Sequence, residues 1–161
     1  MPHQSMQTLQ FDNAQFLPHV CDLIDEGHTV SIRAKGNSMR PFMESERDIA
    51  VLSKATDIEK GDVVLAEIEQ GHFVLHRIDA IMGPKVRLRG DGNPYQTEMC
   101  LLTDIRAKAI RIVRKGKTYD LNGHTWRIYS FFWTNLRSIR RWLLALYRWL
   151  WLGQVPHRLK K

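Results

Sequence analysis

The two side chains of this sequence best suited to chemistry are Ser38 and His76. Ser38 follows Gly36 and Asn37 in a turn-forming stretch, and His76 lies at the end of an apolar run. A serine hydroxyl is a poor nucleophile at neutral pH and needs a base to accept its proton. Apolar neighbours favour a neutral imidazole, so His76 is the best candidate for that base. The pair predicts nucleophilic catalysis, in which Ser38 attacks a carbonyl carbon and forms an acyl-enzyme.

A third group is expected on the second ring nitrogen of His76. A carboxylate there would fix the tautomer and stabilise the imidazolium that forms during the reaction. We nominate Asp91 for this role, with Glu98 and Asp104 as alternatives. Because Asp91 lies in the sequence Gly-Asp-Gly, an ordinary turn residue is the competing interpretation.

The turn around Ser38, the serine turn, indicates which groups would hold a reacting carbonyl. Backbone N–H groups of the turn, that of Ser38 included, are expected to stabilise the oxyanion. Gly36 and Met39 are predicted to contact the substrate, since a glycine lets a peptide backbone approach closely. Taken alone, a serine beside glycine and asparagine is usually only a turn residue, and His76 alone would be a partly buried strand histidine.

A metal site at His72 and His76 is rejected. On a helix, two histidines four residues apart can share one ion. On a strand they stand about 13 Å apart at roughly 3.3 Å per residue. We therefore expect neither a metal nor another cofactor.

The positive charge of the chain is confined to its C-terminal part. The 161 residues carry a net charge of +7, but residues 121–161 hold eight Lys or Arg and no Asp or Glu, along with all five Trp. Residues 1–120 are nearly neutral, with 16 basic and 17 acidic side chains. With 43% hydrophobic and 25% charged residues, the sequence is typical of a folded protein. The two cysteines, without CxxC spacing, are expected to be free thiols in a reducing compartment.

The elements that must position Ser38 and His76 are mostly strands. A helix is expected from about Asn13 to Glu26, ended by Gly27, because apolar residues recur there at helical spacing. Strands are predicted at 29–33, 48–52, 63–68, 72–78, 85–89, 103–114 and 117–121. The fold class is therefore mostly β, an antiparallel domain with a helix before it and helical structure after it.

The candidate base lies in a predicted hairpin. Gln70 and Gly71 would form a two-residue loop, so that Glu69 pairs with His72 and Leu65 lies opposite His76. Val63, Leu65, Val74 and Ile78 would then share the face of His76.

Residues 132–152 predict one basic amphipathic helix. Its apolar face comprises Phe132, Leu136, Ile139, Leu143, Leu146, Tyr147 and Leu150, with Trp142 and Trp149 at its border and Arg137, Arg141 and Arg148 opposite. The uncharged part is too short for a bilayer about 30 Å thick. We expect this helix to lie in an anionic membrane interface, or else to pack on the domain or on a partner. Nucleic acid is disfavoured, because bulky aliphatic residues separate the basic ones.

Four stretches together resemble the signal peptidase and LexA-repressor clan of serine proteases. They are Ser38-Met39-Arg40-Pro41-Phe42, the strand sequence 46–51, Lys60-Gly61-Asp62-Val63-Val64 running into Leu75-His76-Arg77-Ile78, and Gly90-Asp91-Gly92-Asn93. The resemblance covers roughly residues 29–114. It implies a signal-peptidase-like β fold and a serine endopeptidase that binds an extended peptide along strand edges, with small side chains before the cut.

The chain departs from that pattern in informative ways. Bacterial signal peptidases and LexA-type proteases place a lysine where this chain has His76, so the chain resembles the endoplasmic-reticulum and archaeal Ser/His branch. Gly92 interrupts the usual Gly-Asp-Asn, and Gly36 stands where many bacterial enzymes have a serine or threonine that helps to hold the oxyanion. No N-terminal stretch is hydrophobic enough for a membrane anchor, and the residues before Ser38 are too few for a helix-turn-helix domain.

These observations predict three parts: a lead-in and helix at 1–28, a catalytic β domain at 29–121 and a Trp-rich helical tail at 122–161. The expected function is cleavage of a precursor or leader peptide through Ser38 and His76, in the cytoplasm and peripheral to a membrane. The alternative is a non-catalytic peptide-binding or regulatory module of the same fold.

Overall fold

The structure is a computed structural model that describes residues 13–33, 35–93, 95–135 and 137–152. Its described strands are β1 (Val30–Arg33), β2 (Ile49–Ser53), β3 (Val63–Glu69), β4 (His72–Met82), β5 (Lys85–Arg89), β6 (Glu98–Leu101), β7 (Ile105–Arg114) and β8 (Lys117–Asp120). They form one antiparallel sheet in the order β1-β2-β7-β3-β4-β5-β6, with β8 paired to β7. The mostly β, antiparallel fold class is therefore confirmed.

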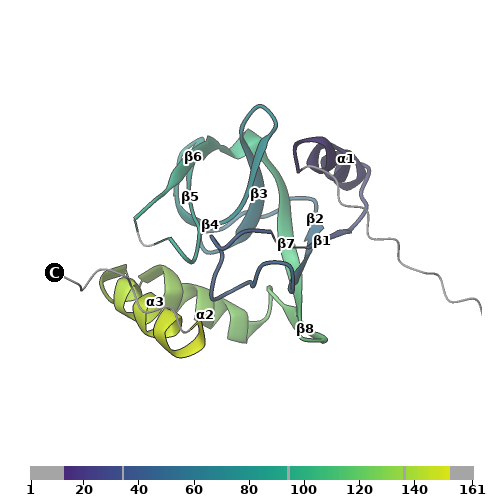
Figure 1. Ribbon diagram of the computed structural model, residues 1–161. Helices are drawn as coiled ribbons and strands as arrows, with labels where there is room; N and C mark the ends of the chain where they lie inside the picture. Colours follow the sequence, from purple (N-terminus) through teal and green to yellow (C-terminus); the bar gives the residue numbers. More distant parts are fainter. Residues whose placement is uncertain (1–12, 34, 94, 136, 153–161) are drawn as a thin grey trace, which may run out of the picture.

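Three α-helices of the described part of the chain flank the sheet. Helix α1 (Asn13–Asp25) lies beside one part of the strongly curved sheet, and α2 (His124–Asn135) and α3 (Arg137–Leu152) lie together at the opposite side (Figure 1). A short 3-10 turn, η1 (Leu102–Asp104), joins β6 to β7. The span 132–152, predicted as a single helix, is divided between α2, which ends at Asn135, and α3, which begins at Arg137.

The curvature of the sheet creates two hydrophobic clusters. The larger contains buried residues of α1, the serine turn and strands β2, β3 and β7, with Trp126 and Tyr129 of α2 packed against it. The smaller lies inside the curve of β3 to β7 and includes Val64, Ile78 and Leu88. Successive side chains of a strand point to opposite faces of the sheet, so they enter the two clusters alternately.

The hairpin of β3 and β4 differs from its predicted register. Glu69 pairs with His72 as predicted, but a bulge between Glu67 and Glu69 places Val64, not Leu65, opposite His76. One extra residue on a bulged strand reverses the faces of the residues beyond it. His76 therefore shares its side of the sheet with the smaller cluster, while Leu65 faces the larger one.

The predicted apolar face of the tail is divided in the structure. Leu143 and Tyr147 are partly covered, whereas Leu146 and Leu150 are exposed. Tyr147 donates its hydroxyl hydrogen to Glu44 of the serine turn, which explains why that side of α3 turns inward. Leu136 and the side chain of Ile139, together with those of Arg137, Arg141 and Arg148, lie outside the described residues.

Candidate active site

Ser38 lies in a compact turn between β1 and β2. The N–H of Arg40 donates to the carbonyl of Asn37 at 3.2 Å, and the N–H of Met43 donates to that of Met39 at 2.9 Å. Met39 and Met43 are buried in the larger cluster, whereas Ser38 is only half-buried. The buried side chains of Met39 and Met43 thus hold the turn against the core, and Ser38 lies at the surface of the turn.

The loop after β5 packs directly on this turn. The N–H of Gly92 donates to the carbonyl of Ser38 at 2.7 Å. A Cβ on Gly90 would lie 2.5 Å from that same oxygen and 3.1 Å from Nε2 of His76. The carbonyl of Ser38 and the imidazole of His76 therefore face one small space beside Gly90, which only a glycine leaves open.

His76 reaches this space from the middle of β4. It is 5% exposed, and its Nδ1 lies 2.8 Å from Oε2 of Glu98 on β6. An ionised carboxylate only accepts hydrogen bonds, so this contact favours the tautomer with the proton on Nδ1. Nε2, the nitrogen nearest Gly90 and the serine turn, is then the one able to accept a proton.

Asp91, the residue nominated as the partner of His76, binds Arg77 in this structure. Both oxygens of Asp91 are bound by Arg77, whose Nε and NH2 donate at 2.9 Å and 2.6 Å. Arg77 follows His76 on β4, and successive strand side chains point to opposite faces. Arg77 and His76 thus point to opposite faces of β4, and Asp91 binds Arg77 rather than filling the place beside Nδ1 of His76. Glu98, one of the two alternatives, is the residue that occupies that place.

Arg77 ties the site to α2. Its NH1 donates to the carbonyl of Gly61 at 2.8 Å and to Oγ of Ser130 at 2.7 Å. The rings of Phe42, Trp126 and Tyr129 lie within 6 Å of its guanidinium carbon, at 4.9, 5.9 and 5.7 Å. Burial alone would lower the pKa of Arg77, but the buried charge of Asp91 raises it, so the guanidinium stays charged.

Arg77 is the important residue that sequence reasoning missed. A signal was present, because an arginine inside an apolar strand requires a buried anion. Asp91 in the Gly-Asp-Gly loop was the natural partner for Arg77. Assigning Asp91 to Arg77 would have left Glu98 or Asp104 as the carboxylate for His76.

The remaining predicted site residues differ in their exposure and in their contacts. Gly36 is exposed at the mouth of the turn with φ +93°, and its N–H donates to Oγ of Ser45 at 3.0 Å. Met39 is 5% exposed and packs in the larger cluster, so little of its side chain is open to a substrate. Asp104 accepts from the N–H of Leu101 at 2.7 Å and helps to shape the 3-10 turn.

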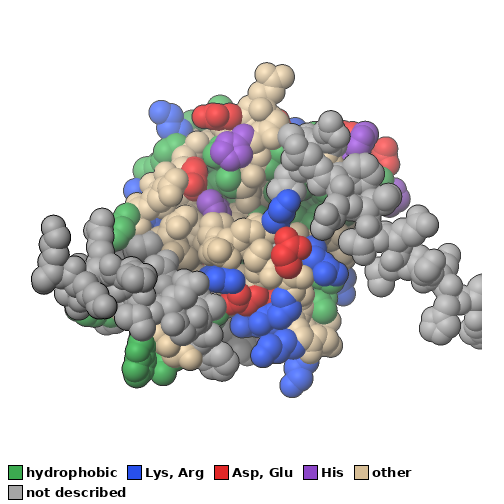
Figure 2. Space-filling model, in the orientation of Figure 1, with side chains coloured by type: hydrophobic (Ala, Val, Ile, Leu, Met, Phe, Trp, Pro, Cys, Tyr) green, Lys and Arg blue, Asp and Glu red, His purple; other side chains and the backbone are tan. Residues whose placement is uncertain are grey.

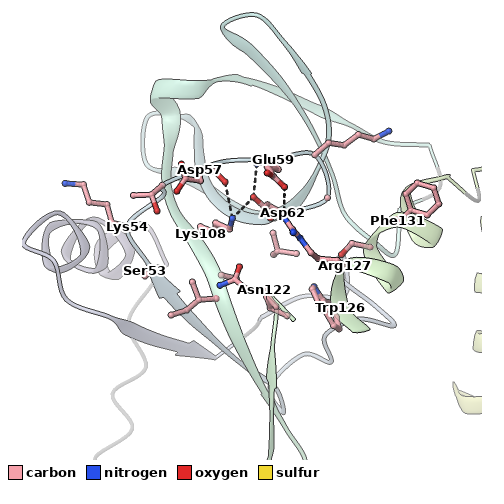
Figure 3. A pocket seen from close by; sticks show the side chains of 18 residues that line it. Ser53, Lys54, Asp57, Glu59, Asp62, Lys108, Asn122, Trp126, Arg127 and Phe131 are labelled. Atoms are coloured by element: carbon pink, nitrogen blue, oxygen red, sulfur yellow. Dashed lines mark hydrogen bonds and ion pairs between the residues drawn. The ribbon is translucent and has the colours of Figure 1, made fainter. Parts of the chain in front are cut away.

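The described residues also line a cavity away from the serine turn. It measures about 600 Å³ and runs between β7, the segment 53–63 and α2. Figure 3 shows Lys108 pointing between Asp57 and Asp62, and Arg127 meeting Glu59 across the opening. Two ion pairs, Lys108 with Asp62 and Arg127 with Glu59, thus lie in its lining, and Ser38 and His76 do not line it.

The geometry supports proton transfer at one point, beside Gly90. The described residues show no hydrogen bond between the hydroxyl of Ser38 and His76, although the imidazole nitrogen and the serine backbone face the same space. None of their hydrogen bonds uses the N–H of Ser38, which suits the predicted oxyanion role of that group. Hydrogen bonds between catalytic groups are often long before substrate binds.

Comparison with known proteins agrees with the fold and with the placement of the motifs. The sequence matches a family model described as Peptidase S24-like over residues 3–113. No match was found among curated proteins. The matched stretch includes Ser38, His76, Gly90 and Glu98 and ends within β7, before α2 and α3. Because the match covers well over half of the sequence, the chain belongs to the Peptidase S24-like family.

Proposed function

We propose that this protein is a serine endopeptidase in which Ser38 is the nucleophile and His76 the general base. The observation that carries the proposal is the placement of His76: Nδ1 contacts Glu98 at 2.8 Å, and Nε2 faces Gly90 and the serine turn. A base oriented by a carboxylate is the arrangement that activates a serine hydroxyl.

The reaction follows from these groups. Nε2 of His76 takes the hydroxyl proton as Ser38 attacks the scissile carbonyl, and Glu98 stabilises the imidazolium that results. The imidazolium then gives this proton to the leaving amine, which departs and leaves an acyl-enzyme on Ser38. His76 then deprotonates a water molecule, which attacks the acyl-enzyme ester. The imidazolium gives this proton to the departing oxygen of Ser38, which restores the hydroxyl.

The expected substrate is an extended segment of a precursor or leader peptide. Ser38 lies in a turn beside edge strand β1, and Glu98 lies on edge strand β6. Edge strands offer unpaired backbone groups to an extended peptide. The buried Met39 leaves Gly36 as the predicted substrate contact that is exposed at this turn.

A second candidate is a peptide-binding or regulatory module that has the fold without the activity. The observation in its favour is that the described residues show no hydrogen bond between Ser38 and His76. This candidate predicts that peptides bind equally well to the wild type and to Ser38→Ala and remain uncut.

A peptide-library cleavage assay with mass-spectrometric detection separates the two. Ser38→Ala and His76→Ala should abolish cleavage, and Glu98→Gln should lower kcat by about 10²- to 10⁴-fold, because His76 loses its orienting charge. His72→Ala is the matched control, since His72 is exposed on the same strand. Equal cleavage by wild type, Ser38→Ala and His76→Ala would refute the enzyme proposal.

A further inference from the structure

Helix α2 has an apolar outer side in addition to its packed inner side. Ser130 and Trp133 are buried toward the sheet, at 7% and 8% exposure. Ile128, Phe131 and Phe132 are 57%, 64% and 57% exposed, at the spacing of one helix face. Phe131 and Phe132 lie edge to face with ring centroids 5.8 Å apart.

Helix α3 repeats this arrangement. Its inner side holds Leu144, which is 4% exposed, and Tyr147, which bonds Glu44. Its outer stripe is Trp142, Leu146, Trp149 and Leu150, which are 64%, 50%, 63% and 59% exposed and follow an i, i+4, i+7, i+8 spacing. Figure 2 shows hydrophobic side chains at the lower left edge of the molecule, where α3 lies in Figure 1.

The charged side chains of the C-terminal part of the chain, which includes α2 and α3, are all basic. Residues 121–161 contain eight Lys or Arg and no Asp or Glu, and four of the arginines belong to α3. Arg137, Arg141 and Arg148 recur at positions on one face of the helical wheel, roughly opposite the outer stripe. Helix α3 thus combines an apolar stripe with a basic face.

We propose that the lipid-facing surface, made of Ile128, Phe131, Phe132, Trp142, Leu146, Trp149 and Leu150, docks in the plane of an anionic lipid bilayer. Basic helices with an apolar face that is rich in aromatic residues bind such interfaces by burying that face and attracting anionic headgroups. The inner sides of both helices hold buried residues, whereas the seven residues of the outer side remain at least half exposed. Among the described residues, no helix is long and apolar enough to cross a membrane.

Docking through this surface would also fix the orientation of the serine site. Ser130 of α2 accepts a hydrogen bond from Arg77, which is adjacent to His76 on β4. This hydrogen bond links α2 to the strand that carries His76. The proposal does not depend on peptidase activity, because lipid binding is measured without any substrate.

The test is flotation of the full chain with phosphatidylcholine vesicles that contain or lack phosphatidylglycerol. The wild type should float with the anionic vesicles and much less with the neutral ones, and added salt should weaken binding. Leu146→Ser with Leu150→Ser should lower the partition coefficient by at least about tenfold, because two exposed apolar side chains no longer enter the interface. The matched control is Ile81→Ser with Met82→Ser, which changes two exposed apolar residues of β4 at 38% and 46% exposure.

A second pair of variants tests the charge. Arg141→Gln with Arg148→Gln should weaken binding to anionic vesicles by about 10- to 30-fold, given the attraction of each basic residue to an anionic surface. Lys85→Gln with Lys117→Gln, two exposed residues of the β sheet, should not change it. The proposal is overturned if the wild type does not float with anionic vesicles, or if the control pairs reduce flotation equally. It is also overturned if the leucine pair instead abolishes a concentration-dependent self-association, since the surface would then bind a second copy.

Discussion

The substitution Gly90→Ala tests the proposed site most directly. A Cβ at this position would lie 2.5 Å from the carbonyl oxygen of Ser38 and 3.1 Å from Nε2 of His76, whereas ordinary contacts begin at 3.4 Å. To relieve the shorter contact, the serine turn and the loop after β5 must separate by close to an ångström. Both neighbours belong to the proposed catalytic machinery, so this separation misplaces nucleophile and base relative to each other.

The expected effect on catalysis is large. A misplacement of about 1 Å between reacting groups can lower the rate by about 10²-fold. Overpacking of a tight contact typically lowers the free energy of unfolding by about 1–3 kcal/mol. We therefore expect Gly90→Ala to fold but to lose about 10²-fold in kcat on the best library peptide, with a smaller change in KM.

The assay is steady-state cleavage, paired with urea unfolding of the same samples. Gly123→Ala is the control, because its Cβ would meet only the carbonyl of Asp120 at 3.3 Å, far from the serine turn in the chain. This control should keep wild-type kcat. If Gly90→Ala is folded and retains wild-type kcat, the space beside Gly90 is not where the reaction occurs.

Three further predictions concern the groups that support the site. Arg77→Met should lower the free energy of unfolding by about 3–5 kcal/mol in urea titrations, because Asp91 stays buried without its partner; an unchanged midpoint would contradict this. Burial would raise the pKa of Asp48, but bonds from Arg47 and from the N–H of Glu44 outweigh it and hold the pKa below its ordinary value. Stability from Asp48 should thus be complete above about pH 4 and lost as the pH falls through its folded pKa, and Asp48→Asn should flatten the acid limb of a stability–pH curve. Burial, followed by the charge of Asp104, raises the pKa of Cys100 to about 11, so native Cys100 should resist alkylation by iodoacetamide at pH 8 and react after denaturation, as mass spectrometry would show.

Much of the sheet was predictable because its strands alternate and its turns contain glycine. The helix at Asn13–Asp25 and the strand at Lys85–Arg89 follow the predicted spans closely. Strand β6 was missed, since four residues without alternation carry little signal. This omission also hid the site, because β6 is the element that brings Glu98 to His76.

The bulge and the choice of carboxylate could not be derived from local pattern. Nothing in Glu67-Ile68-Glu69 distinguishes a bulged strand from a regular one, yet the bulge decides which residues share a face with His76. Asp91 and Glu98 are chemically alike, and their assignment depends on which side of β4 each reaches. Only the three-dimensional path of the loop after β5 settles that question.

The arrangement around Arg77 has a consequence for how the protein is made. The loop with Asp91 and the strand β4 leave the ribosome before Trp126, Tyr129 and Ser130 emerge from it. Until those residues emerge, the guanidinium has Asp91 and Gly61 but lacks its hydroxyl partner and two of its three rings. The nascent chain therefore completes the strands of its sheet with an unfinished interior beside the serine, and the emergence of α2 determines when that interior is complete.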